Sequence, residues 1–151
     1  MADLLENTLE GLKKLGCGIE RVDRTLLVTL PDKFAEFVFE HLGGWLYLGT
    51  TFLTPDELSE APYPDRLEHF LLILQHRNLG CRFSYDAGGF LSIGTELSPG
   101  QQSPEEILEN MEQIAFVIEI CLPLCDHVLA TGEIPADKDV DQAFGITDSL
   151  H

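Results

Sequence analysis

The fold is decided by residues 80–97, which read GCRFSYDAGGFLSIGTEL. Apolar or aromatic side chains alternate with polar ones from residue 81 to residue 86, which is the two-residue period of a half-buried β-strand. The segment Ala87-Gly88-Gly89 then predicts a tight turn, because glycine adopts the positive φ angles that such turns require. Beyond the turn, Leu91, Ile93 and Leu97 share one face of a returning strand. The stretch therefore predicts a β-hairpin with one apolar face.

A helix is predicted on each side of this hairpin. Residues 66–77 carry apolar residues at helical spacing along a broad stripe, so more than one side of this helix should be covered. After the hairpin, the run Ser103-Pro104-Glu105-Glu106 is a capping box with proline at the first helical position, which predicts a helix start. Pro123 should kink or interrupt this second helix, and Gly132 should end it.

The first half of the chain predicts one helix and an antiparallel meander. A leucine stripe indicates a helix over residues 3–15. Residues 19–22 and 25–30 resemble the two arms of a short hairpin, and the aromatic and β-branched segment 45–53 predicts a strand. Residues 33–42 fit either a helix face or a strand, and their Phe-Val-Phe composition favours the strand. We read these segments as a three-stranded meander. The predicted fold class is therefore α+β, with the order α-β-β-β-α-β-β-α and an antiparallel sheet packed with helices.

Length and charge narrow the range of functions. The 151 residues fit a single domain, with residues 1–132 as its folded part and the acidic residues 133–151 as a loosely ordered tail. Nine Lys and Arg residues face 26 Asp and Glu residues, so the formal net charge is −17. Such a chain repels nucleic-acid phosphates and anionic membranes, and it attracts cationic partners. No uninterrupted apolar run has the length of a membrane span and the first residues lack the basic region of a signal peptide, so we expect a cytoplasmic protein with reduced cysteines.

The sequence contains no recognisable catalytic apparatus. No glycine-rich phosphate loop follows a strand, no nucleophile elbow is present, and capping explains the paired carboxylates at 105–106. One alternative stays open, because Cys121 and Cys125 lie four residues apart on one helix face and could bind zinc together with His127 or His41. Reduced core cysteines are the favoured interpretation. We therefore expect no catalytic residues, no metal and no cofactor.

Three aromatic residues predict a protein-binding surface. Trp45 and Tyr47 share one strand face, and Phe90 points away from Leu91 and Ile93 on its own strand. If helices cover one face of the sheet, these aromatics lie on the other face, where aromatic side chains commonly anchor protein interfaces. The competing interpretation is that they fill a second small core, and the residues alone leave both readings open.

Residues 66–132 contain a helix ending near an Asn, a hairpin of the form apolar-x-apolar-Asp-x-x-Gly-x-apolar, and a long amphipathic helix. The segments that carry this pattern are residues 67–78 (LEHFLLILQHRN), 81–93, 96–97, 120–124, 128–129 and 132–133. The pattern resembles the YbjN family and the related class I type III secretion chaperones. The predicted order of elements over residues 3–130 matches both groups, and the closing stretch is more similar to YbjN proteins. The tail beyond residue 133 has no clear counterpart.

The resemblance implies a compact α+β domain over residues 1–132, usually a homodimer, without catalytic residues. For such a dimer, Leu67, Phe70 and Leu74 are the expected interface residues. The predicted function is that of a cytoplasmic, bacterial, chaperone-like or regulatory adaptor that binds a protein partner, a basic one on grounds of charge. The alternatives are a dedicated type III secretion chaperone for an effector, and a metal-binding sensor or enzyme that uses Cys121, Cys125 and a histidine.

Overall fold

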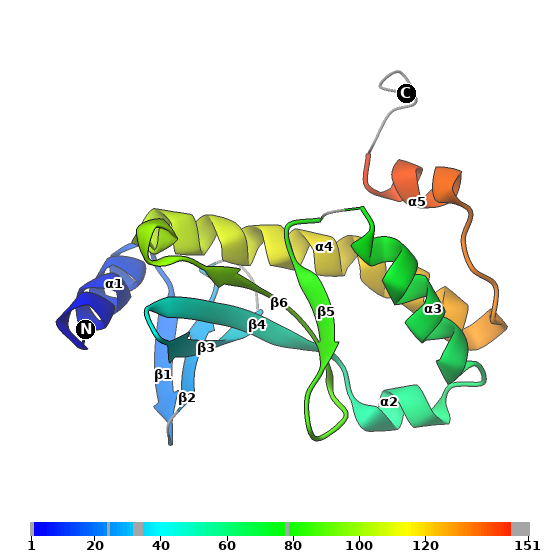
Figure 1. Ribbon diagram of the computed structural model, residues 1–151, viewed down its shortest axis with the longest axis horizontal. Helices are drawn as coiled ribbons and strands as arrows, with labels where there is room; N and C mark the ends of the chain where they lie inside the picture. The colour runs from blue at the N-terminus through cyan, green and yellow to red at the C-terminus, as the bar shows by residue number, and fades with distance from the viewer. Residues whose placement is uncertain (1, 24, 32–34, 78, 146–151) are drawn as a thin grey trace.

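The computed structural model describes residues 2–23, 25–31, 35–77 and 79–145, in which a six-stranded antiparallel sheet is packed with helices (Figure 1). The strands are β1 (Gly18–Val22), β2 (Thr25–Thr29), β3 (Glu36–Leu42), β4 (Trp45–Leu53), β5 (Arg82–Tyr85) and β6 (Leu91–Leu97). The helices are α1 (Ala2–Lys14), α2 (Pro55–Glu60), α3 (Pro64–Gln75), α4 (Pro104–Thr131) and α5 (Asp137–Ala143), with a 3₁₀ turn at Pro99–Gln101. The order of strands across the sheet is β1-β2-β3-β4-β6-β5.

The predicted hairpin at residues 80–97 is confirmed. Strands β5 and β6 pair antiparallel, with Phe83 opposite Ile93. The carboxylate of Asp86 closes the turn by accepting hydrogen bonds from the N–H groups of Gly88 (2.9 Å) and Phe90 (3.0 Å). Helix α3 precedes the hairpin and α4 follows it, so the arrangement on which the fold prediction depends is present.

The first half of the chain contains one strand more than predicted. Residues 36–42 form β3, so the ambiguous segment belongs to the sheet, and residues 32–34 lie outside the described residues. Strands β1 to β4 are successive antiparallel neighbours, so four strands rather than three lie between α1 and α2. The short helix α2 follows β4, and Thr54 and Glu57 form a capping box at its start. The α+β class is confirmed, while β1, α2 and α5 lengthen the predicted order.

Strand register divides the sheet into two faces. Phe39 lies opposite Leu48, and Leu48 lies opposite Thr95, so these side chains project to the same side, which we call the covered face. Helix α1 packs beside β1, α4 packs on β4 and β6, and the two helices contact each other. The covered face is buried and includes Leu26, Val28, Phe37, Phe39, Leu46, Leu48, Ile93 and Leu97. The opposite side is the open face, whose residues on β3 and β4 are mostly exposed or half-buried.

Helix α4 is the core helix, and Figure 1 shows it running along the sheet with α1 at its first turns and α3 beside its second half. Its predicted ends are confirmed, because Ser103 Oγ accepts a hydrogen bond from the N–H of Glu106 (3.2 Å) and Gly132 caps the other end at φ 74°. The helix continues through Pro123, so of the predicted kink or interruption the interruption does not occur. Pro123 lies on an exposed side of α4, where water can replace the lost backbone hydrogen bond. By length and composition α4 could cross a membrane (mean hydropathy 1.8 over its most apolar window), and its role as core helix accounts for that composition.

The C-terminal segment contains a docked helix. Helix α5 buries Val140 completely. Arg77, just beyond α3, forms ion pairs with Asp137 (3.2 Å) and with Asp141. Nε of Arg66 donates a hydrogen bond to the carbonyl of Gly132 (3.1 Å). Part of the segment expected to be loosely ordered is therefore held against α3, while residues 146–151 lie outside the described residues.

Candidate protein-binding surfaces

An apolar strip crosses the open face, and we call it the open-face strip. It consists of Leu27, Val38, Leu42, Trp45 and Tyr47. Register makes these residues neighbours, because Leu27 pairs with Val38 and Leu42 pairs with Trp45. Leu42 is 72% exposed and Trp45 is 49% exposed. Covering such side chains removes apolar area from water, so the strip is a candidate surface for binding a protein.

A hollow of about 300 Å³ lies beside the strip, and we call it the open-face hollow. Its walls come from four adjacent strands and include Val38, Glu40, Tyr47, Gly49, Ser84, Asp86 and Ser92. Glycine occupies facing positions in the middle of the sheet beside the hollow, where Gly49 on β4 pairs with Gly94 on β6.

The ring of Tyr47 lies along the sheet surface in this hollow. A Cβ atom built on Gly49 would lie 2.3 Å from Oη of Tyr47, and one built on Gly94 would lie 2.6 Å from the same atom. Both distances are far below a van der Waals contact, so the phenol end occupies the space that two ordinary side chains would fill. The two glycines thus allow an aromatic ring to lie flat on the strands rather than to stand up from them.

Carboxylates flank Tyr47 on both neighbouring strands. Glu40 lies opposite Tyr47 on β3, and Glu96 lies opposite it on β6. Glu96 forms an ion pair with Arg82, whereas Glu40 forms none with a described residue. Burial is the main cause that raises the pKa of Tyr47, and the two carboxylates raise it further against the opposing effects of Arg82 and a hydrogen bond with Ser84. The ring therefore stays uncharged at neutral pH.

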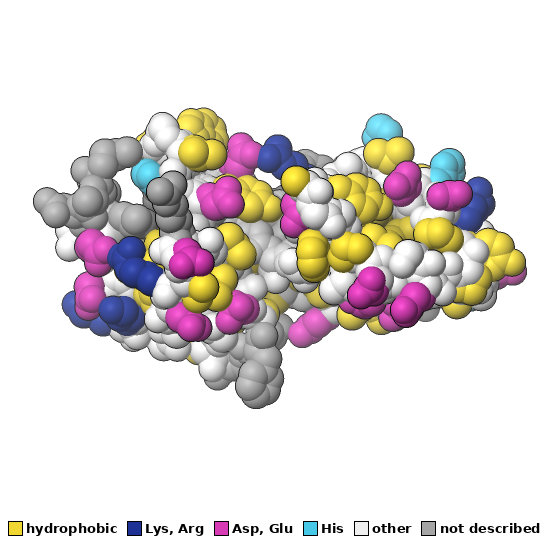
Figure 2. Space-filling view, turned by 90° about the horizontal axis from the view of Figure 1, so that it is seen from below, with side chains coloured by type: hydrophobic (Ala, Val, Ile, Leu, Met, Phe, Trp, Pro, Cys, Tyr) yellow, Lys and Arg dark blue, Asp and Glu magenta, His cyan; other side chains and the backbone are white. Residues whose placement is uncertain are grey.

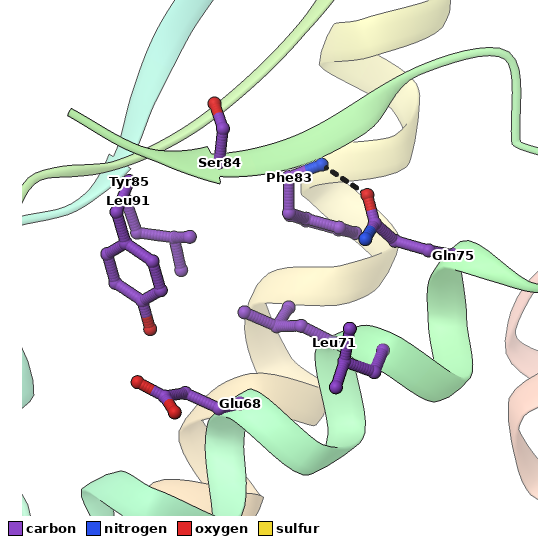
Figure 3. A pocket seen from close by; sticks show the side chains of 8 residues that line it. Glu68, Leu71, Gln75, Phe83, Ser84, Tyr85 and Leu91 are labelled. Atoms are coloured by element: carbon purple, nitrogen blue, oxygen red, sulfur yellow. Dashed lines mark hydrogen bonds between the residues drawn. The ribbon is translucent and has the colours of Figure 1, made fainter.

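A second depression, the α3–β5 groove, lies where α3 approaches the edge strand β5 (Figure 3). It has a volume of about 340 Å³ and an apolar lining that includes Leu71, Leu72, Phe83 and Leu91. The chain itself satisfies polar groups here, because Oε1 of Gln75 accepts a hydrogen bond from the N–H of Phe83 (3.0 Å). Tyr85 points toward Glu68, and burial first, then the charge and hydrogen bond of Glu68, raise the pKa of Tyr85. The groove is partly closed by these contacts.

The three predicted partner-binding residues do not form one cluster. Trp45 and Tyr47 share the open face of β4, as their spacing predicts. Phe90 is 38% exposed and lies in the turn of the β5–β6 hairpin, where its ring covers Gly88. Their role in binding stays a prediction.

The residues expected at a dimer interface lie in the core instead. Leu67, Phe70 and Leu74 are each 0% exposed within a single chain, because this side of α3 packs on α4. Within one chain these side chains are already covered, and their role at a dimer interface stays a prediction. The exposed apolar residue of this helix is Leu72, at 65%. Sequence periodicity identifies an apolar stripe, but it does not say whether the same chain or a partner covers it.

Sequence reasoning did not identify the hollow. Its position depends on the pairing of β4 with β6, which brings together glycines at positions 49 and 94. A signal was present, because glycine within a strand pattern often marks a close approach to the backbone, and both segments carry one. The contribution of Glu40 was likewise hidden in the segment 33–42, whose strand or helix character was ambiguous.

The cysteines are embedded in the core rather than arranged around a metal. Cys121 and Cys125 are each 0% exposed, and burial raises the pKa of Cys121 to about 12 and raises that of Cys125. His127 lies 51% exposed and 3.6 Å from the carboxylate of Glu133. Among the described residues, no group of three His, Cys, Asp or Glu side chains is placed to hold a metal ion.

Acidic residues surround these surfaces. Figure 2 shows carboxylates spread over the face seen from below, among exposed apolar side chains. On the open face, Glu20, Glu36, Glu40 and Glu96 are all exposed. A partner that approaches the strip therefore meets negative charge around an apolar centre.

Comparison with known proteins gives structural neighbours only. No protein-family model matches the chain, and no curated protein matches it by sequence. A chain in the crystal structure of the ExsC–ExsE complex has a TM-score of 0.60 at 14% identity, over 87% of this chain and 97% of that one. A chain in the heterodimeric ExoU–SpcU complex from the type III secretion system of Pseudomonas aeruginosa has a TM-score of 0.56 at 19% identity, over 82% and 98%. At such identities the likeness shows the fold alone. It confirms the predicted α+β fold of type III secretion chaperone type, and the resemblance to YbjN proteins is not confirmed.

Proposed function

We propose that this chain is a non-catalytic, chaperone-like module that binds an extended segment of a partner protein on the open face of its sheet. The open-face strip carries the proposal. Leu42 and Trp45 are 72% and 49% exposed at the turn end of the β3–β4 hairpin, whereas the other face of the same strands is buried. Large exposed apolar side chains rimmed by charge are typical of protein-binding sites. The fold is shared with chains of two protein–protein complexes, which supports the proposal.

The partner segment is proposed to combine apolar and basic residues. Apolar side chains would cover Trp45 and Leu42, and basic ones would lie near the surrounding carboxylates of Glu36 and Glu40. The net charge of −17 would accelerate the approach of such a segment, and this acceleration should decline as salt is added.

The test compares two aromatic residues of similar exposure. The wild-type chain is used to isolate its partner from the native host, and the dissociation constant is then measured with purified proteins. Trp45→Ala should weaken binding by about tenfold or more, because aromatic anchors dominate such interfaces. Phe116, which is 44% exposed on α4, is the control, and Phe116→Ala should leave the constant within about twofold. Equal losses in both variants contradict binding at the open face.

We also propose that the chain acts as a cytoplasmic homodimer. Leu72 on α3 supports this, because it is 65% exposed and lies on the rim of the α3–β5 groove, where a second copy can cover it. Light scattering at micromolar concentration should give the mass of a dimer, and Leu72→Glu should give that of a monomer. A monomeric wild-type chain would count against the dimer without affecting the open-face proposal.

A dedicated type III secretion chaperone is the second candidate, favoured by the likeness to a chain of the ExoU–SpcU complex. This candidate requires that the captured partner be a secreted effector. A regulatory role of the YbjN type requires instead a partner that stays in the cell. Identifying the partner by mass spectrometry and testing whether it is exported separates the two.

A further inference from the structure

The open-face hollow combines an aromatic ring with carboxylates. Tyr47 lies along its floor in the space left by Gly49 and Gly94. Glu40 stands directly across from Tyr47 on β3, and it is exposed and forms no ion pair with a described residue. The hollow has a volume of about 300 Å³, which is enough to admit a side chain from a bound segment.

A cationic side chain fits this combination. The face of an aromatic ring carries partial negative charge and attracts an ammonium or guanidinium group. A guanidinium is planar, so it stacks on a ring while its N–H groups donate to a carboxylate in a fork. The α3–β5 groove lacks this fit, because its tyrosine and its glutamate already interact with each other.

We propose that the open-face hollow binds an arginine side chain of the partner segment, with the guanidinium stacked on Tyr47 and donating hydrogen bonds to Glu40. This inference rests on the proposed function and deepens it by naming the residue that the hollow takes. Charge complementarity supports it, because Glu40 is exposed and Asp86 lines the hollow, whereas Glu96, on the other side of the ring, is already paired with Arg82. One oxygen of Asp86 is engaged by the turn, so Glu40 is the principal acceptor.

The position of Trp45 adds a spacing to the motif. Trp45 and Tyr47 are two residues apart on β4 and project to the same face, about 7 Å apart along the strand. An extended segment that runs along β4 has the same spacing between alternate side chains. The partner segment should therefore carry an apolar residue two positions from the arginine, so that one covers Trp45 while the other enters the hollow.

The experiment uses a designed probe peptide, acetyl-Leu-Thr-Arg-Thr-Leu-amide, and the same peptide with citrulline in place of arginine. Citrulline keeps the shape of the side chain and removes its charge. Titration followed by amide NMR should give shifts centred on Gly49 and Gly94, with the arginine peptide binding about tenfold tighter than the citrulline peptide. Equal affinity of the two peptides would overturn the proposal.

Four variants locate the effect. Glu40→Gln and Tyr47→Leu should each lower the affinity for the arginine peptide to near that for the citrulline peptide, while Tyr47→Phe, which keeps the ring, should stay within about twofold. Glu20→Gln is the matched control, because Glu20 is exposed on the same face and separated from β3 by β2. A loss in Glu20→Gln as large as that in Glu40→Gln would mean that the acidic surface as a whole, rather than Glu40, attracts the peptide. This result would overturn the proposal. Glu40 is exposed, so its variant remains informative if Tyr47→Leu does not fold.

The two proposals can fail separately. If Trp45→Ala abolishes binding of the natural partner while Glu40→Gln and Tyr47→Leu leave it unchanged, the open face binds the partner and the arginine site is wrong. If Trp45→Ala also leaves binding unchanged, the open-face function itself is wrong.

Discussion

The two faces of the sheet differ in burial, and strand β4 shows this difference within four consecutive residues. Leu46 and Leu48 are 1% and 0% exposed, whereas Trp45 is 49% exposed and Tyr47 lies half-buried between them. Side chains on a strand alternate, so one set packs under α1 and α4 while the other set faces outward. We therefore predict that, under the proposed function, substitutions one residue apart change the stability of this protein and its binding of a partner independently.

Of the substitutions that compare the two faces, Leu48→Ala should have the largest effect on the free energy of unfolding. Leu48 is fully buried opposite Phe39 on the covered face, so truncation leaves a cavity beneath α4. The free energy of unfolding should fall by about 2–5 kcal/mol, measured by urea unfolding followed by circular dichroism. Thr51→Ala, at an exposed open-face position on the same strand, should change it by less than about 0.5 kcal/mol. Comparable losses in both variants would show that the faces are not energetically distinct.

Gly49→Ala tests whether Tyr47 lies flat on the open face. The new methyl group would overlap Oη of Tyr47 at 2.3 Å, so the free energy of unfolding should fall by about 1–3 kcal/mol. In a Tyr47→Ala background the ring is absent, and the cost of Gly49→Ala should shrink by at least about 0.5 kcal/mol. Urea unfolding of the wild type, the two single variants and the double variant gives the coupling free energy between positions 47 and 49.

Two other glycines serve as references for this cycle. A Cβ on Gly94 would lie 2.7 Å from the carbonyl oxygen of Leu48, which is backbone, so Gly94→Ala should remain costly without Tyr47. Gly100 has nothing within 4 Å of its Cβ position, so Gly100→Ala should be nearly neutral. A Gly49→Ala cost that is unchanged by removing Tyr47 would mean that the ring does not occupy the hollow.

The thiols of Cys121 and Cys81 should also make the free energy of unfolding sensitive to alkaline pH. Burial, with a smaller effect of Cys81, raises the pKa of Cys121 from 9.0 to about 12, and burial raises that of Cys81 to about 11. The folded chain then keeps protons that the unfolded chain releases, so the contribution to stability is complete below pH 9 and declines as pH rises toward 11 and 12. Urea midpoints at pH 8, 9 and 10 should fall more steeply in the wild type than in Cys121→Ala. Identical slopes would show that the buried thiol does not control this range.

Local patterns predicted this fold well where one element depends only on its own residues. The hairpin at 80–97 and the start and end of α4 follow from alternation, a capping box and a terminal glycine, and each is confirmed. Pro123 was expected to kink or interrupt α4, and the helix is not interrupted, because a proline is tolerated where the lost hydrogen bond faces water. Periodicity could not show that α4, rather than a second copy, covers Leu67. The remaining features of the fold depend on pairing between strands that are distant in the sequence.

The candidate site depended almost wholly on such pairing. The shared face of Trp45 and Tyr47 could be predicted from their spacing on one strand. The neighbours that give Tyr47 its chemistry come from other strands, because Glu40 reaches it across β3–β4 and Gly94 across β4–β6. No local pattern fixes which strands become neighbours when a helix-containing segment of the chain lies between them. The hollow is therefore a property of topology.

Trp45→Ala should have a small effect on stability and a large effect on binding, so it gives the sharpest test of the comparison. Because Trp45 is 49% exposed, its truncation should lower the free energy of unfolding by no more than about 1 kcal/mol, while weakening the natural partner about tenfold. Leu42→Ser, at the position opposite Trp45 and 72% exposed, should behave in the same way with a smaller loss of binding. Unfolding of Trp45→Ala would show instead that Trp45 belongs to a second core, and the open face would then contribute to the fold rather than to recognition.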